Sequence, residues 1–112
     1  MTDLRFDHLY RETHHWDDSV AFWKTLGFSF TQQWGETPHR AGSLRSSDVT
    51  IVLAEVDSTT RLGESTFIST TDLEQIGNDL GTTPAETHWG TMMVTATDPD
   101  GRVYNFETKE SG

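Results

Sequence analysis

Apolar and polar side chains alternate along most of the chain, and this period of two is typical of β-strands with one buried face. In the first half of the sequence, the alternation predicts strands at residues 4–10, 28–34, 40–46 and 49–56. In the second half, it predicts strands at residues 64–70, 85–88, 92–97 and 102–107. Each half of the chain is therefore expected to contribute the same number of strands.

One segment of the first half has apolar residues at helical spacing instead. These residues are Trp16, Val20, Trp23 and Gly27, with Phe22 and Leu26 alongside. They predict an amphipathic helix over about 16–26, with Gly27 as its C-terminal cap. Asp17 and Asp18 fall in its first turn, where the helix dipole favours negative charge. We expect this helix to be a packing element.

The second half contains a shorter predicted helix, at residues 72–80. Its apolar face consists of Leu73, Ile76 and Leu80. Thr71 or Asp72 can cap its N-terminus, and Gln75 stands three residues beyond Asp72, as in a capping box. Gly81 is expected to end it.

The order strand, helix, strand, strand, strand thus occurs twice, on either side of a polar connector at residues 57–63. The sequence predicts an α+β protein built from two βαβββ modules, about 1–57 and about 64–110. Together they are expected to form a single domain over residues 1–112. A chain of this length can build a core without disulfides or structural metals.

The segment Asp98-Pro99-Asp100-Gly101 is a strong signal for a tight turn. Pro99 fixes φ near the value that the second turn position needs, and Gly101 tolerates a positive φ. Because strands are predicted on both sides, the segment is expected to close a β-hairpin whose second strand lines a site.

Composition and charge exclude several function classes. The absence of cysteine rules out disulfides, thiolate nucleophiles and thiolate metal sites. The net charge of −10 argues against nucleic acid or an anionic membrane as partner, and solubility is its simplest role. No apolar run approaches the ~20 residues of a membrane span, and the N-terminus lacks a signal peptide's apolar stretch, so we expect a cytoplasmic protein.

Several segments taken together resemble the glyoxalase/bleomycin-resistance/dioxygenase superfamily, also called vicinal oxygen chelate proteins. These segments are FDHLY, SVAFWKTLGF, the helix start at residues 71–74, Trp89-Gly90 and DPDGRVYNFE. The resemblance covers essentially the whole chain. It implies that the strands of both modules curl into an open, cup-like half-barrel with the helices packed outside and the ligand or metal in the cup.

The resemblance also implies four inward-facing positions that hold the metal in the superfamily's metal-dependent enzymes. They are matched here by His8, Val52, Ser65 and Asn105. Transition metals in such sites need at least three imidazole or carboxylate ligands, and only His8 is a good one. Glu107 shares the face of Asn105 but lies ~6–7 Å further along the strand. No metal and no other cofactor is therefore expected.

The expected lining of the cup combines strand alternation with the positions that the resemblance implies. It comprises Phe6, His8, Tyr10, Trp34, Val52, Ser65, Phe67, Trp89, Met93, Asn105 and Glu107. Trp34 and Trp89 lie at predicted strand ends, and one of them is expected to stack on a ligand. Of the neighbours Met92 and Met93, only one can point inward. The aromatic and neutral part of this lining has no lysine or arginine, so an anion would be buried there without a counter-charge.

The favoured function is a metal-independent protein that binds a neutral or cationic aromatic compound, with sequestration of that compound as one form of the function. Basic antibiotics of the bleomycin type are one candidate, as the resemblance implies. The alternatives are a metal-free lyase or isomerase with His8 as general base, and a metal-dependent lyase or dioxygenase with a rearranged site. His8 is equally well explained as a hydrogen-bonded pocket residue. The resemblance also implies a homodimer, which would cover exposed sheet edges.

Overall fold

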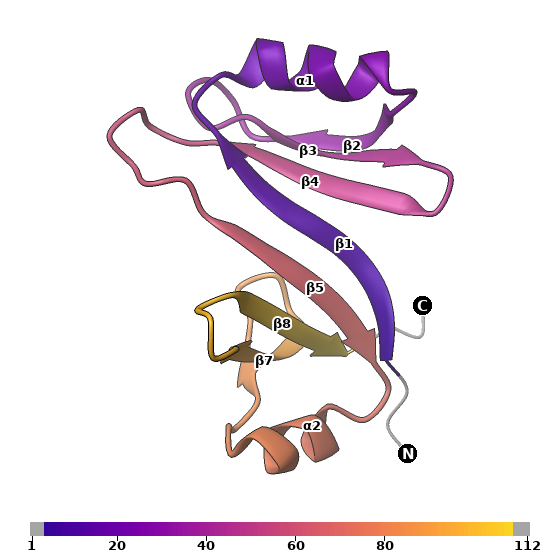
Figure 1. Cartoon of the computed structure of the whole chain (residues 1–112), viewed down its shortest axis with the longest axis vertical. Coiled ribbons are helices and arrows are strands. Elements are labelled where there is room, and N and C mark those ends of the chain that lie inside the picture. The colour runs from indigo at the N-terminus through magenta and orange to yellow at the C-terminus, as the bar shows by residue number, and fades with distance from the viewer. Residues whose placement is uncertain (1–3, 109–112) are drawn as a thin grey trace. The chain divides into compact units, whose positions relative to one another are not determined.

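A computed structural model of the protein describes residues 4–108 (Figure 1). Its elements are β1 (Leu4–Thr13), α1 (Trp16–Thr25), β2 (Ser29–Trp34), β3 (Ala41–Ser46), β4 (Val49–Glu55), β5 (Glu64–Thr70), α2 (Leu73–Leu80), β6 (Ala85–Glu86), β7 (Met92–Thr97) and β8 (Val103–Thr108). The βαβββ order therefore occurs twice. The eight strands form one open sheet in the order β2-β3-β4-β1-β5-β8-β7-β6. The predicted α+β class is confirmed.

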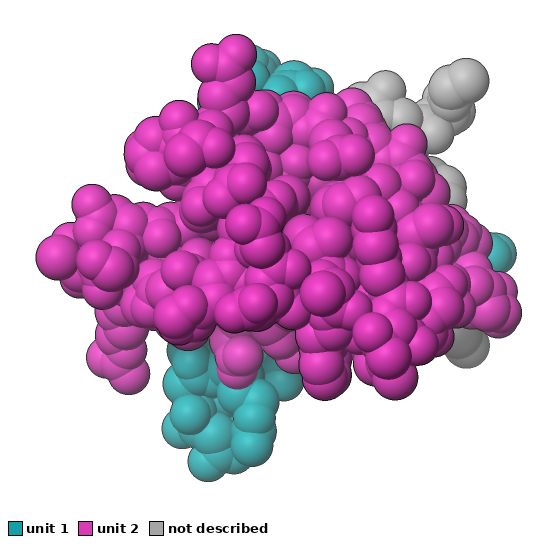
Figure 2. Space-filling view, turned by 90° about the horizontal axis from the view of Figure 1, so that it is seen from above, with its two compact units in different colours: residues 1–7, 65–112 teal, residues 8–64 magenta. Residues whose placement is uncertain are grey.

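The chain divides into two compact units (Figure 2). Unit 2 consists of residues 8–64, and unit 1 combines residues 1–7 with residues 65–112. Strand β1 therefore contributes to both units: its first described residues belong to unit 1 and its remainder to unit 2. Within unit 2, β1 runs parallel to β4, and within unit 1, β5 runs parallel to β8.

The core of unit 2 lies between α1 and one face of strands β3 and β4. Trp16, Leu44 and Leu53 are buried at its centre, as the helical spacing of Trp16 predicts. Phe22 and Leu26 were expected beside the apolar stripe, but both side chains are 58% exposed. They lie beside the residues that pack against the sheet, and Phe22 meets the ring of Trp23 edge to face at 5.0 Å. Gly27 follows the helix with a φ of 95°, and Leu26 takes the C-cap position itself.

A bidentate ion pair in unit 2 joins Arg40, which precedes β3, to Glu55 at the end of β4. Arg40 donates from Nε and Nη2 to the two carboxylate oxygens of Glu55, at 2.9 and 2.8 Å. The backbone N–H of Arg40 donates to the same carboxylate at 3.1 Å. The guanidinium lies over the ring of Trp16, 5.6 Å from its centroid. These hydrogen bonds from Arg40 lower the pKa of Glu55 from 4.5 to about 2.

This pair makes the stability of the protein sensitive to acid. Because the pKa of Glu55 is lowered on folding, its stabilisation is complete above pH 4.5 and is lost as the pH falls towards 2. We expect Glu55→Gln to lower the free energy of unfolding at pH 7 and to flatten its decline between these values. Urea titrations at a series of pH values measure both effects. The control is Glu36→Gln, which removes an exposed carboxylate from a turn; identical pH profiles for the Glu55 variant and the wild type would contradict the assignment.

The core of unit 1 lies between α2 and one face of strands β7 and β8. Leu73, Ile76 and Val94 are buried there, and Phe106 packs against them. The carboxylate of Asp72 caps α2 by accepting a hydrogen bond from the backbone N–H of Gln75 at 3.2 Å. The reciprocal half of the expected capping box is not formed.

The side chains of Asp79 and Thr70 bind the groups that the missing half of the capping box would need. The Gln75 side chain donates to Asp79 at 2.8 Å, and the backbone N–H of Asp72 donates to the hydroxyl of Thr70 at 3.1 Å. The Asp72 N–H that would have donated to the Gln75 side chain is therefore already bound, and that side chain is held by Asp79 instead. Gly81 ends the helix in the left-handed conformation, with a φ of 69°.

The turn between β7 and β8 forms as its sequence predicts. Gly101 has a φ of 87° and donates its backbone N–H to the carbonyl of Asp98 at 3.0 Å. One carboxylate oxygen of Asp98 accepts the backbone N–H groups of Asp100 and Arg102, both at 2.9 Å. These bonds, with that of the Arg102 amide first, lower the pKa of Asp98. Neither helix of the described chain is long and apolar enough to cross a membrane.

Candidate functional site

Strand register assigns the side chains of unit 1 to two faces. Val94 pairs with Phe106, and both belong to the face covered by α2. Thr95 pairs with Asn105 and Met93 with Glu107, so these four side chains belong to the opposite face. We call this face, which also carries Ser65 and Phe67 of β5, the helix-free face of unit 1.

The register also distinguishes the two adjacent methionines. Met93 pairs with Glu107 and is half-buried on the helix-free face. Met92 alternates to the other face and is 39% exposed. Of the two, Met93 is therefore the one on the face of Asn105 and Glu107.

Asn105 is at the centre of a neutral hydrogen-bonded cluster. Its side chain is 8% exposed. Its Nδ2 donates to the hydroxyl of Ser65 at 3.2 Å, and its Oδ1 accepts from the hydroxyl of Thr95 at 2.7 Å. The sequence singled out Ser65 and Asn105 separately but missed Thr95, although alternation with Met93 could have indicated it.

A second cluster surrounds Glu107. Its Oε2 accepts from the indole Nε1 of Trp89 and from the hydroxyl of Thr91, each at 2.5 Å. Trp89 is 50% exposed, and its ring meets that of His88 edge to face at 4.7 Å. The loop that carries Trp89 is folded by hydrogen bonds between Thr87 and Thr91. This folding explains why β6 ends at Glu86, before the predicted residue 88.

Four of the predicted site residues belong to unit 2. Tyr10 pairs with Val52, on the face opposite the α1-covered Leu53, and alternation assigns His8 to the face of Tyr10. Trp34 pairs with Ala41 at the end of β2 and is 45% exposed.

Tyr10 is held by its neighbour two residues along β1. Its hydroxyl donates to Glu12 at 2.8 Å. Burial, together with this hydrogen bond and the charge of Glu12, raises the pKa of Tyr10 to about 12. Tyr10 is therefore a neutral hydrogen-bonding group at ordinary pH. Phe6, on the part of β1 that belongs to unit 1, is 51% exposed.

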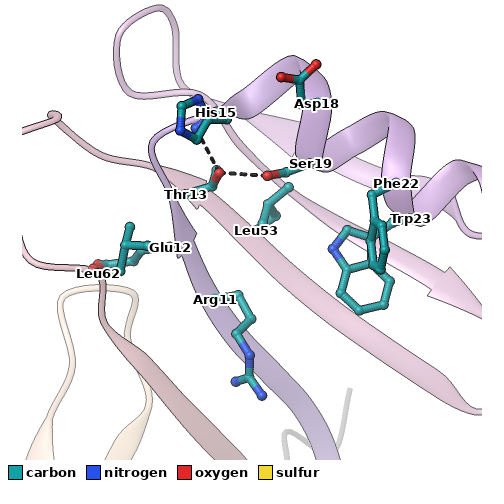
Figure 3. A pocket seen from close by; sticks show the side chains of 10 residues that line it. All are labelled: Arg11, Glu12, Thr13, His15, Asp18, Ser19, Phe22, Trp23, Leu53 and Leu62. Carbon is teal, nitrogen blue, oxygen red and sulfur yellow. Dashed lines mark hydrogen bonds between the residues drawn. The ribbon is translucent and has the colours of Figure 1, made fainter.

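Unit 2 also contains an open groove of about 570 Å³, beside α1 and β1 (Figure 3). It is lined by Arg11, Glu12, Thr13, His15, Asp18, Ser19, Phe22, Trp23, Leu53 and Leu62. None of the predicted site residues is among them. Nothing in the sequence indicates this groove, because Leu62 lies in a connector without periodicity and Phe22 is expected beside the apolar stripe of the helix.

Most of the polar groups in this groove already serve the local structure. The hydroxyls of Thr13 and Ser19 bond each other at 2.7 Å and so join β1 to α1. Glu12 accepts the backbone N–H of Gly63 at 2.6 Å and thereby ties the connector to β1. The helix-free face of unit 1 instead brings together five of the predicted site residues, which makes it the candidate binding site: Ser65, Phe67, Met93, Asn105 and Glu107.

A scan against protein-family models gives no match, and no curated protein matches the sequence. Solved structures do match, at low sequence identity. A hypothetical protein from Bacillus halodurans C-125 gives a TM-score of 0.74 at 13% identity, over 98% of this chain and 97% of that chain. A glyoxalase/bleomycin resistance protein/dioxygenase superfamily member from Vibrio splendidus 12B01 gives 0.73 at 12% identity, over 97% of this chain and 100% of that chain.

The chain has the fold of the glyoxalase/bleomycin resistance protein/dioxygenase superfamily. An enzyme is also among the solved structures that are similar to this chain in fold. A methylmalonyl-CoA epimerase from Streptomyces coelicolor, in complex with 2-nitronate-propionyl-CoA, gives a TM-score of 0.65 at 20% identity. The match covers 96% of this chain and 98% of the epimerase.

The residues at the positions where the resemblance implies metal ligands do not fit a divalent transition metal. Val52 offers no donor atom, and the side chains of Ser65 and Asn105 are neutral and bonded to each other. Within the described residues, no group of three or more histidine, aspartate or glutamate side chains could hold a metal ion. The glyoxalase fold here therefore carries a donor set better suited to hydrogen bonding than to metal coordination.

Proposed function

We propose that the protein binds a small molecule without a metal ion, and that its ligand is a neutral or cationic, partly aromatic compound. The observation that supports this most directly is the chemistry of the helix-free face of unit 1. There the aromatic and apolar side chains of Phe67 and Met93 lie beside the neutral cluster of Asn105. Glu107 adds a negative charge.

The distribution of charge argues against anionic ligands. Strands β5, β7 and β8 contain no lysine and no arginine. An anion on the helix-free face would have no counter-charge from these strands and would also face a chain of net charge −10. A neutral or cationic aromatic compound has neither cost, and the exposed ring of Trp89 can stack on it.

The neighbouring structures support the proposal at the level of the fold. The Streptomyces coelicolor epimerase holds 2-nitronate-propionyl-CoA, so this fold accommodates small molecules. The epimerase's ligand is not carried over to this chain. Sequestration of a basic antibiotic of the bleomycin type is one form that the proposed function takes. We also propose that the protein is a homodimer and is located in the cytoplasm.

A thermal-shift screen tests this function. The panel should contain equal numbers of cationic aromatic, neutral aromatic and anionic compounds. A ligand at ~100 times its Kd stabilises a protein by roughly 2.7 kcal/mol, which should raise the melting temperature by several degrees. We expect such shifts from cationic and neutral aromatic compounds, and none from Zn²⁺, Ni²⁺, Mn²⁺ or Fe²⁺. Reproducible shifts from anions alone would contradict the proposed ligand class.

A further inference from the structure

The carboxylate of Glu107 is held in an asymmetric way. Both of its donors, Trp89 Nε1 and Thr91 Oγ1, bond the same oxygen, Oε2, at 2.5 Å. Within strands β5, β7 and β8, no donor bonds the other oxygen, Oε1. The side chain is thus fixed at one oxygen while the second can still accept a hydrogen bond.

The strand neighbours of Glu107 carry no positive charge. The cross-strand neighbour of Glu107 in β7 is Met93, and its partner in β5 is Ser69. The two donors that hold it are an indole and a hydroxyl, both neutral. None of these four neighbours neutralises the carboxylate, which belongs to a half-buried residue. Two fixed hydrogen bonds also reduce the rotamer entropy that a ligand would have to restrict.

An aromatic surface lies next to this charge. Trp89 is bonded through its Nε1 to Oε2, so its indole edge is fixed at the carboxylate. Half of Trp89 is nevertheless exposed, and the His88 ring supports it from the side. A flat apolar body can contact the indole while a group attached to it reaches the carboxylate.

We propose that Glu107 is the specificity-determining residue of the binding site and anchors a protonated amine of an aromatic ligand through Oε1. This inference rests on the proposed function and narrows its ligand class to aromatic amines. A charge-assisted hydrogen bond from an ammonium group is stronger than one from a neutral hydroxyl. The protein should therefore discriminate between two ligands that differ only in that group.

Tryptamine and tryptophol are suitable probes, because they share an indole-ethyl skeleton and differ in carrying an ammonium or a hydroxyl group. Isothermal titration at low ionic strength should give the wild type at least a roughly tenfold lower Kd for tryptamine, a difference of about 1.4 kcal/mol. In Glu107→Gln, the two Kd values should become equal within about twofold while that of tryptophol is retained. Retained binding of tryptophol would show that the variant is folded and its site intact.

The matched control is Glu86→Gln, which removes the same charge from unit 1. Glu86 is exposed on β6 and pairs with Met92, so it belongs to the face opposite Glu107. It should keep the preference for tryptamine, which separates a local anchor from the general attraction of an acidic protein for cations. A preference that survives in Glu107→Gln, or that Glu86→Gln abolishes equally, would overturn the anchor.

The outcomes also separate this inference from the proposed function. Equal binding of both probes by the wild type would overturn the role of Glu107 and leave a binder of neutral and cationic aromatic compounds. Failure of both probes to bind at millimolar concentrations would overturn the anchor. If no aromatic compound of the wider panel bound either, the proposed function would be overturned with it.

Discussion

Leu44→Ala should lower the free energy of unfolding by about 2–5 kcal/mol, because it leaves a cavity in the core of unit 2. Leu44 lies in β3, is 0% exposed, and is buried with Trp16 and Leu53. Its truncation removes part of the packing between α1 and the sheet. Domains of this size are stable by only about 5–15 kcal/mol, so the loss is a large fraction of the total. Urea unfolding followed by tryptophan fluorescence measures it.

Leu26→Ala is the matched control for this prediction. It removes the same atoms from a side chain that is 58% exposed at the end of α1. We expect the free energy of unfolding to change by no more than about 0.5 kcal/mol. Similar losses in both variants would mean that burial does not decide the cost, and would contradict the placement of Leu44.

Gly77→Ala should destabilise the protein although it places a better helix former in α2. In an isolated helix, alanine in place of glycine stabilises by about 1 kcal/mol. Here an added Cβ would lie 2.5 Å from the carbonyl oxygen of Thr82 and 3.2 Å from Cδ of Pro84. The chain after the helix would have to shift, and such overpacking costs about 1–3 kcal/mol. We expect a net loss of up to about 2 kcal/mol in urea unfolding.

Asn78→Ala separates helix propensity from packing at the adjacent position. Asn78 is exposed in the same helix, so alanine there meets no neighbour and should leave stability unchanged or raise it slightly. A Gly77→Ala variant that is more stable than the wild type would show that the segment after α2 moves away freely. The close approach of residues 82–84 to the helix would then be wrong.

Local chemistry explains why much of the fold could be predicted from the sequence. The turn at Gly101 and the cap at Asp72 depend on residues within four positions of each other, and both form as expected. The alternation of Asn105 and Glu107 with the apolar, partly buried Phe106 likewise gives the two faces of β8. Such patterns report on which face a residue belongs to, whatever the rest of the chain does.

The parts that could not be predicted depend on contacts between segments far apart in the chain. Trp89 and Thr91 meet Glu107 across a hairpin, so nothing near position 107 indicates that its carboxylate is held by two donors. Phe22 is a large apolar residue of the kind that usually lies in a core. Its exposure depends on which side of α1 packs against the sheet. Apolar spacing alone does not distinguish a buried stripe from its exposed flank.

The division of β1 between two compact units has a consequence for how the chain reaches its native state. The hydroxyl of Ser69 donates to the carbonyl of Arg5 at 3.4 Å, which joins residues 64 positions apart. Unit 1 therefore requires closure of a loop that contains nearly all of unit 2, and contacts of such long range slow folding. During synthesis from the N-terminus, residues 8–64 can leave the ribosome as a continuous segment and fold, whereas residues 4–7 must wait for β5. Strand β1 is therefore synthesised first, but its unit 1 part takes its place only after β5 has been synthesised.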